Sequence, residues 1–184
     1  EKEEEIVDVA SGHAFTLFVT KSGLVWATGN KFLDTISQNS EAPIQLTLPK
    51  GKKALRVWAC CGPDHPVAFL ELLDEATGAK RLFSAGKSEK GMLAQGDKVL
   101  ESREFREIKY GSPTLVFESL HLGLESATAI DTEGQLWGWG FNEHRRLGLD
   151  DVADNGIHRP LALYPLNGLG LKAKQVSCGN LHTL

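Results

Sequence analysis

The sequence has few cysteines and no long apolar stretch. Its 184 residues include three cysteines, an odd number that argues against a disulfide framework and for a reducing compartment. We therefore expect an intracellular protein, without distinguishing cytoplasm, nucleus and cilium. No run of about 18 apolar residues is present, so we expect no membrane span. The first residues, EKEEE, lack the basic and apolar blocks of a secretory signal.

Clustered positive charge is also missing. Lysine and arginine number 20 against 24 acidic residues, and the net charge is −4. Proteins that bind nucleic acid use a basic stripe or patch, so the composition argues against a nucleic-acid partner. The sequence contains no CxxC pair, no HExxH and no GxSxG. It therefore predicts no catalytic residue, no metal site and no cofactor.

What the sequence does contain is a set of spaced glycines that repeats along the chain. The spacing is 11 and then 6 residues in the first and third copies, and 16 and then 8 in the second. A fourth copy begins near the end with a single glycine. The glycines are, copy by copy, Gly12, Gly23 and Gly29; Gly62, Gly78 and Gly86; Gly123, Gly134 and Gly140; and Gly179.

Each copy has the pattern of short antiparallel strands. FTLFV and SATAI are rich in apolar and β-branched residues, and LVWATG and QLWGWG follow them after KSG and TEG. The glycine of these triplets suits a tight hairpin turn. The proline-bearing connections each hold a short apolar run that we expect to form an outer strand. Three or four strands in about 50 residues are typical of one blade of a β-propeller, so we predict an all-β fold.

Two stretches carry a family resemblance. KQVSCGNLHTL (174–184) and EGQLWGWGFNEHRRLGL (133–149) resemble the regulator of chromosome condensation repeat. The resemblance implies a seven-bladed propeller, of which this chain supplies three to four blades in one partial domain, 1–184. The remaining blades would come from the same chain or another one. The repeats are expected at about 6–50, 51–110, 111–172 and, truncated, 173–184.

Within that framework we assign a structural role to the repeated positions. They are the ten glycines above, three tryptophans expected to pack between blades (Trp26, Trp137 and Trp139), and two histidines that each follow a first glycine by three residues (His65 and His182).

Three glycine-rich alternatives fit the sequence less well. A dinucleotide fingerprint at Gly138 and Gly140 needs a following helix, which the sequence does not predict. A P-loop at Gly86-Lys87-Ser88 needs glycine at position 81, where Arg81 stands. A base-stacking platform needs a basic groove around its aromatics, and only His144, Arg145 and Arg146 supply charge.

The candidate partner-binding loop is the charged connection that follows Gly86. We single out Lys87, Glu89, Lys90, Arg103 and Arg106 there, expect a helical turn, and weigh the alternative that the segment is only a solvated connection. The function predicted is a non-catalytic protein-interaction module. By resemblance, the alternatives are a guanine nucleotide exchange factor for a small GTPase, or a substrate-recruiting or regulatory domain of a larger enzyme such as a ubiquitin ligase or kinase.

Overall fold

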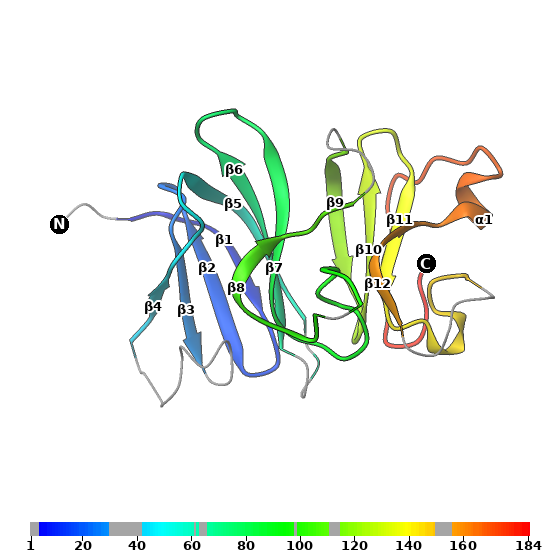
Figure 1. Ribbon diagram of the computed structural model, residues 1–184, viewed down its shortest axis with the longest axis horizontal. Coiled ribbons are helices and arrows are strands. Elements are labelled where there is room, and N and C mark those ends of the chain that lie inside the picture. Colours follow the sequence, from blue (N-terminus) through cyan, green and yellow to red (C-terminus); the bar gives the residue numbers. More distant parts are fainter. Residues whose placement is uncertain are drawn as a thin grey trace. The chain divides into compact units, whose positions relative to one another are not determined.

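The computed structural model describes residues 4–29, 42–60, 62, 66–97, 99–110, 115–149 and 156–184. Within these residues the chain forms three four-stranded antiparallel sheets and two short helices (Figure 1). In every sheet the strands pair in the order in which the chain makes them. The predicted all-β class is therefore confirmed, and each sheet is a meander joined by hairpins.

The first sheet is built from the first copy of the repeat. Leu17 and Val19 on its second strand are fully buried, and Thr16 and Phe18, which alternate with them, are only partly buried. This alternation is what one packed sheet face requires. The fourth strand comes from the apolar run of the proline-bearing connection, as predicted. The strands are β1 (Ile6–Ser11), β2 (Phe15–Thr20), β3 (Val25–Gly29) and β4 (Ile44–Leu46).

The second sheet ends in a strand where we expected a helical turn. Ser102 and Phe105 are both buried, and their three-residue spacing resembles a helical period. A register shift between the Ser84 and Gly86 pairings accommodates this spacing, because a bulge changes which face the following residues occupy. The strands are β5 (Lys52–Ala59), β6 (Val67–Asp74), β7 (Lys80–Lys87) and β8 (Glu101–Glu107).

The third sheet follows the same plan. It is built from β9 (Phe117–Leu122), β10 (Ser126–Asp131), β11 (Leu136–Gly140) and β12 (Ile157–Ala162). A 3₁₀ turn, η1 (Glu143–Arg145), follows β11, and a short helix, α1 (Tyr164–Asn167), follows β12.

The chain divides into two compact units. One contains residues 1–87 and 101–107, and hence the first two sheets; the other contains residues 88–100 and 108–184, and hence the third sheet. In the first unit the two sheets share one apolar core, to which β2 and β3 contribute Leu17 and Val25 and β6 contributes Leu70. Each such fully buried side chain stabilises the fold by about 1.5–3 kcal/mol relative to exposure.

Backbone hydrogen bonds also join consecutive copies. In the first unit the Ala54 amide donates to the Gly23 carbonyl at 3.0 Å, and the Val57 amide donates to an Asp8 carboxylate oxygen at 2.9 Å. In the second unit the Ala173 amide donates to the Gly134 carbonyl at 2.8 Å. The second glycine of a copy thus accepts a bond from the next copy in both units.

Candidate interaction surfaces

The second glycines lie in the hairpins between the second and third strands. Gly23 and Gly134 donate their amides to the carbonyls of Thr20 and Asp131, three residues earlier, at 2.9 and 3.0 Å. Gly78 donates to the Asp74 carbonyl, four residues earlier, at 2.8 Å. The second copy therefore has the longer turn that its wider glycine spacing indicates.

The third glycines lie at the end of the third strand of each sheet, as its last residue in β3 and β11 and its last but one in β7. Gly29, Gly86 and Gly140 have φ values of +100°, +125° and +91°, a region that favours glycine. A Cβ atom at each would collide with a backbone carbonyl oxygen, that of Ala14, Pro66 or Glu125 respectively. The six- or eight-residue step between second and third glycines therefore reflects a steric requirement at the strand end.

The first glycines lie where the first strand of a copy turns into the second. The amides of Gly12, Gly123 and Gly179 donate to the carbonyls of Phe15, Ser126 and His182, at 2.8, 2.7 and 2.8 Å. Gly62 is buried, and His65 lies outside the described residues. His182 is exposed, and its ring lies against Gly179.

The tryptophans differ in their surroundings. Trp139 is fully buried, and its indole Nε1 donates to the Met92 carbonyl at 3.1 Å. Trp137 is half-buried and donates from Nε1 to Asp131 Oδ2 at 2.8 Å. Trp26 is half-buried on β3. Trp139 therefore anchors segment 88–100 to the third sheet.

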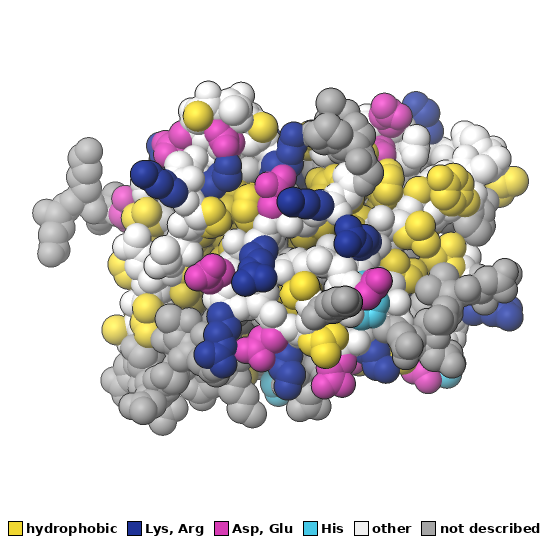
Figure 2. Space-filling model, viewed as in Figure 1, with side chains coloured by type: hydrophobic (Ala, Val, Ile, Leu, Met, Phe, Trp, Pro, Cys, Tyr) yellow, Lys and Arg dark blue, Asp and Glu magenta, His cyan; other side chains and the backbone are white. Residues whose placement is uncertain are grey.

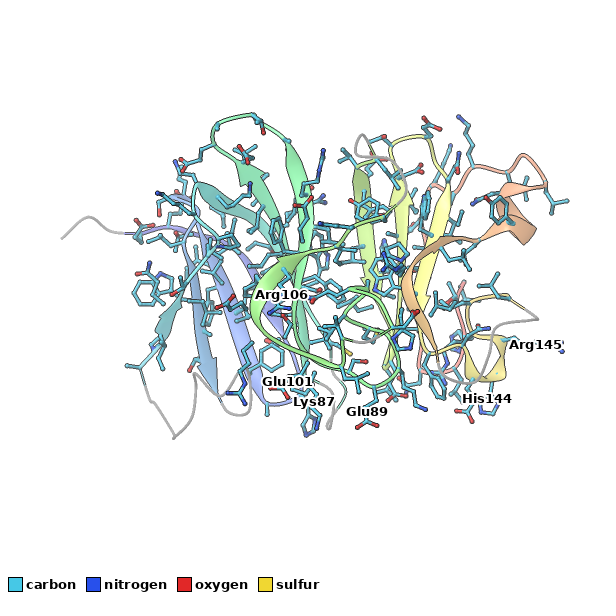
Figure 3. All side chains as sticks on the ribbon, viewed as in Figure 1. Lys87, Glu89, Glu101, Arg106, His144 and Arg145 are labelled. Carbon is cyan, nitrogen blue, oxygen red and sulfur yellow. The ribbon has the colours of Figure 1, made fainter. Side chains whose placement is uncertain are left out.

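Three of the five predicted partner-binding residues lie on neighbouring strands of the second sheet. Lys87 ends β7 and pairs in register with Glu101 of β8, and Arg106 pairs with Ser84 further along (Figure 3). Arg103 is 68% exposed, and its Nε lies 3.0 Å from Glu101 Oε1. Lys87, Arg103 and Arg106 are all exposed, so the structure brings them to one solvent-facing edge.

The other two predicted residues belong to the second unit. Glu89 is exposed, while the Lys90 ammonium lies 4.8 Å from the centre of the Phe141 ring. The Arg146 guanidinium lies 5.0 Å from the same ring. Lys90 thus has a cation–π contact within its own unit.

The sequence reasoning named His144 and Arg145 as charged residues but did not predict the exposed turn that they form. His144 and Arg145 of η1 have φ values of +58° and +56°, unusual for residues with a side chain. Asn142 holds the turn, because its Oδ1 accepts from the Leu147 amide at 2.9 Å and its Nδ2 donates to the Leu149 carbonyl at 2.8 Å. Repeat register was the available signal, since Arg145 follows Gly140 by five residues as Gly91 follows Gly86.

Surface charge is mixed in the part of the chain that the structure describes. Figure 2 shows basic and acidic side chains interspersed on the visible face. Among the described residues, no group of three or more histidine, cysteine, aspartate or glutamate side chains is placed to hold a metal ion. The search of these residues for a helix long and apolar enough to cross a bilayer found none.

Comparison with known proteins agrees with the repeat pattern. Residues 133–184 match the family profile of the regulator of chromosome condensation (RCC1) repeat. The structure superposes on yeast RCC1 (Prp20), solved bound to Kap60, with a TM-score of 0.76 over 100% of this chain at 17% identity. It superposes on human WBSCR16 with a TM-score of 0.70 over 97% of the chain at 19% identity. The chain carries RCC1 repeats. Its three sheets are blades of an RCC1-type β-propeller.

Two relatives in sequence match the chain over almost its whole length. Human "E3 ubiquitin-protein ligase HERC2" is 28% identical over 97% of this chain, and Arabidopsis thaliana "Ultraviolet-B receptor UVR8" is 26% identical over 98%. The chain spans only 4% and 39% of these two relatives, and 42% of Prp20. The RCC1 repeats described here thus correspond to part of each of these longer proteins.

Proposed function

We propose that the chain is a non-catalytic protein-interaction module in which RCC1 blades hold a binding edge. The outer strand β8 carries this proposal. Its five charged residues are exposed, while Ser102 and Phe105 are buried and anchor it to the sheet. A strand fixed in this way presents its side chains with little conformational freedom to lose on binding.

The chemistry of β8 suits a protein partner. Arg103 and Arg106 alternate with Glu101, Glu104 and Glu107, so the edge offers charge of both signs. Arginine is enriched at protein interfaces, and paired charges select a partner of complementary pattern. A polyanion would instead be repelled by the glutamates.

The test starts from partners recovered with the tagged full-length protein from its source cells. Each partner is purified, and its Kd for the chain is measured by titration calorimetry. We expect the double variant R103E/R106E to weaken binding at least about tenfold. The matched control K172E/K174E makes the same charge change at exposed lysines of the second unit and should change the Kd less than about twofold. Equal losses in both variants would refute a role for β8.

A second candidate is an exchange factor or other GTPase regulator. The observation in its favour is 27% identity to mouse "X-linked retinitis pigmentosa GTPase regulator" over 79% of this chain, which spans 14% of that protein. An exchange factor needs no chemistry of its own, because it acts by weakening nucleotide binding. Faster release of fluorescent GDP from a purified small GTPase would favour this candidate; binding without faster release favours the interaction module.

A third candidate is a recruiting or regulatory domain of a larger enzyme. The match to the ubiquitin ligase HERC2 favours it, because there the corresponding segment is a small share of a long chain. In this case, and in the first two, further blades from the same or another chain complete the propeller. Truncation of the full-length protein to remove these repeats would then abolish substrate ubiquitination without abolishing thioester formation on the ligase domain.

A further inference from the structure

A groove of about 620 Å³ opens in the first unit at the ends of the first two sheets. Its walls are the β2–β3 hairpin (22–24), the connection from β4 into β5 (45–53) and Glu75 of the β6–β7 hairpin. This groove lies apart from β8, which lines none of it.

Apolar side chains form the inner wall of the groove. Leu46 is buried, while Leu24 and Leu48 are only half-buried. The half-buried leucines expose apolar surface that a ligand would remove from water, a gain of about 25 cal/mol per Å².

Lysines form the rim. Lys52 is paired with Asp74, and Lys53 Nζ lies 2.7 Å from Glu75 Oε1. Lys50 is exposed and makes no ion pair with any described residue. The rim therefore has more positive than negative charge, although the whole chain is acidic.

The chain already places acidic residues against one wall. Ser22 of the groove donates from Oγ to Glu4 Oε2 at 2.8 Å. Beside it, Lys21 Nζ donates to Glu5 Oε2 and the Lys21 amide donates to the Glu5 carbonyl, both at 2.8 Å. The hairpin thus binds an acidic stretch by backbone and side chain together.

The groove also borders an open strand edge. Among the strands that the structure describes, β4 pairs only with β3 and is the last of its sheet, and Gln45 and Thr47 of the groove are exposed. An open edge offers main-chain donors and acceptors to an extended peptide.

We propose that this groove binds an extended acidic segment of a partner protein. Its carboxylates pair with Lys50 and Lys53, alternate apolar side chains contact Leu24 and Leu48, and its backbone pairs along β4. The inference rests on the proposed interaction function. It adds the groove as a second binding surface and specifies the chemistry of the partner segment that the groove would bind.

The test is fluorescence anisotropy with the 184-residue chain and a labelled peptide of about ten alternating Glu and Val residues. We expect K50E/K53E to weaken binding at least about tenfold and K172E/K174E, with the same charge change at exposed lysines of the second unit, less than about twofold. Lys52 is left intact because its ion pair with Asp74 is largely buried, whereas the pair of Lys53 with Glu75 is exposed to solvent. No binding by the native chain, or equal losses in both variants, would overturn the proposal.

Two further arms separate the remaining explanations. The first arm measures binding of a labelled single-stranded oligothymidylate. If the native chain binds it as tightly as the peptide, and K50E/K53E weakens the binding of both equally, the groove is a general anion site and the peptide proposal is refuted. R103E/R106E should leave peptide binding unchanged. If R103E/R106E loses the partner complex but still binds the peptide, β8 and the groove are separate binding sites. If the native chain forms the partner complex but does not bind the peptide, the groove proposal alone is refuted.

Discussion

The carbonyl oxygen of Pro66 decides which residue can stand at position 86. A Cβ atom there would overlap that oxygen, and φ is +125°. The obstacle is backbone, so no side-chain rotation can relieve it. Gly29 and Gly140 meet the same kind of obstacle in the other two sheets.

We therefore predict that Gly86→Ala destabilises the protein much more than Gly78→Ala. Gly78 has a φ of +71° but no atom within 4 Å of an added Cβ, so alanine should cost only about 1 kcal/mol there. At Gly86 the loss should exceed this by at least about 2 kcal/mol. Urea unfolding measures the free energy of unfolding of both variants. If Gly86→Ala does not fold, Gly29→Ala replaces it, because an added Cβ at Gly29 meets the same kind of obstacle. Similar losses at positions 78 and 86 would mean that the backbone relaxes away from the collision.

Arg145 gives the opposite case, a left-handed position without glycine. In the second copy the corresponding residue is Gly91, and the turns match, because Ala94 donates its amide to the Gly91 carbonyl at 3.0 Å and Gly148 to that of Arg145 at 2.7 Å. A side chain in this conformation costs about 1–2 kcal/mol.

Arg145→Gly is accordingly expected to stabilise the chain by about 0.5–1 kcal/mol, measured by the urea midpoint. Glu143→Gly in the same turn is the matched control; Glu143 is not among the residues with positive φ, so glycine there should be neutral or destabilising. A loss of stability in Arg145→Gly would show that contacts of the arginine outweigh the backbone strain.

Among the elements, the β6–β7 hairpin depends on one carboxylate. Asp74 Oδ1 accepts from the amides of Ala76 and Thr77, each at 2.9 Å, and its other oxygen pairs with Lys52 of β5. The Lys52 ammonium, with these turn amides, holds the pKa of Asp74 well below its ordinary value of 3.8. The hairpin is thus tied to the neighbouring strand.

The lowered pKa of Asp74 predicts an acid-sensitive contribution to stability. A depressed folded-state pKa stabilises the fold above the ordinary pKa, and this stabilisation is lost as the pH falls below 3.8 toward the folded-state value. Asp74→Asn should therefore lower the thermal midpoint at pH 7, and the difference from the native chain should shrink below about pH 4. Glu75→Gln, which removes the more exposed pair with Lys53, is the control. A difference that stays constant with pH would contradict the prediction.

The elements also show what a sequence can predict. The glycine spacing predicted the hairpins, and the apolar run at Ile44–Leu46 predicted an outer strand, because turns and alternation are local properties. β8 was missed because a bulge hides its alternation. The contact of Lys90 with Phe141 joins residues 51 positions apart, which the local sequence pattern does not predict. The groove does not follow from local pattern, because its walls come from three separate segments of the chain.

At the scale of the whole molecule, apolar side chains remain exposed in each unit. In the first unit they are Ile6, Val7 and Val9 of β1, each more than half exposed. In the second unit they include Leu169 and Leu171 after α1, at 72% and 59% exposure. Exposed apolar strands favour association. This agrees with the proposal that further blades complete the propeller.

We predict that the isolated 20.1 kDa chain self-associates as its concentration rises, and that V7K/V9K reduces this association. Native mass spectrometry measures the distribution of oligomers. Leu100→Lys, at a residue 46% exposed outside the sheets, is the control and should leave it unchanged. A chain that stays monomeric at every concentration would contradict the prediction.

The order of strands in each sheet has a consequence for synthesis. Because each described strand pairs only with strands that are its neighbours in the chain, the first sheet can complete its internal hydrogen bonds once Leu46 has left the ribosome. The apolar face that β2 and β3 present to the second sheet stays uncovered until the chain has been extended through β8. A nascent chain therefore passes through a period of exposed apolar surface that ends only with the second sheet, and at about 5–20 residues per second this interval is long enough for chaperones to act.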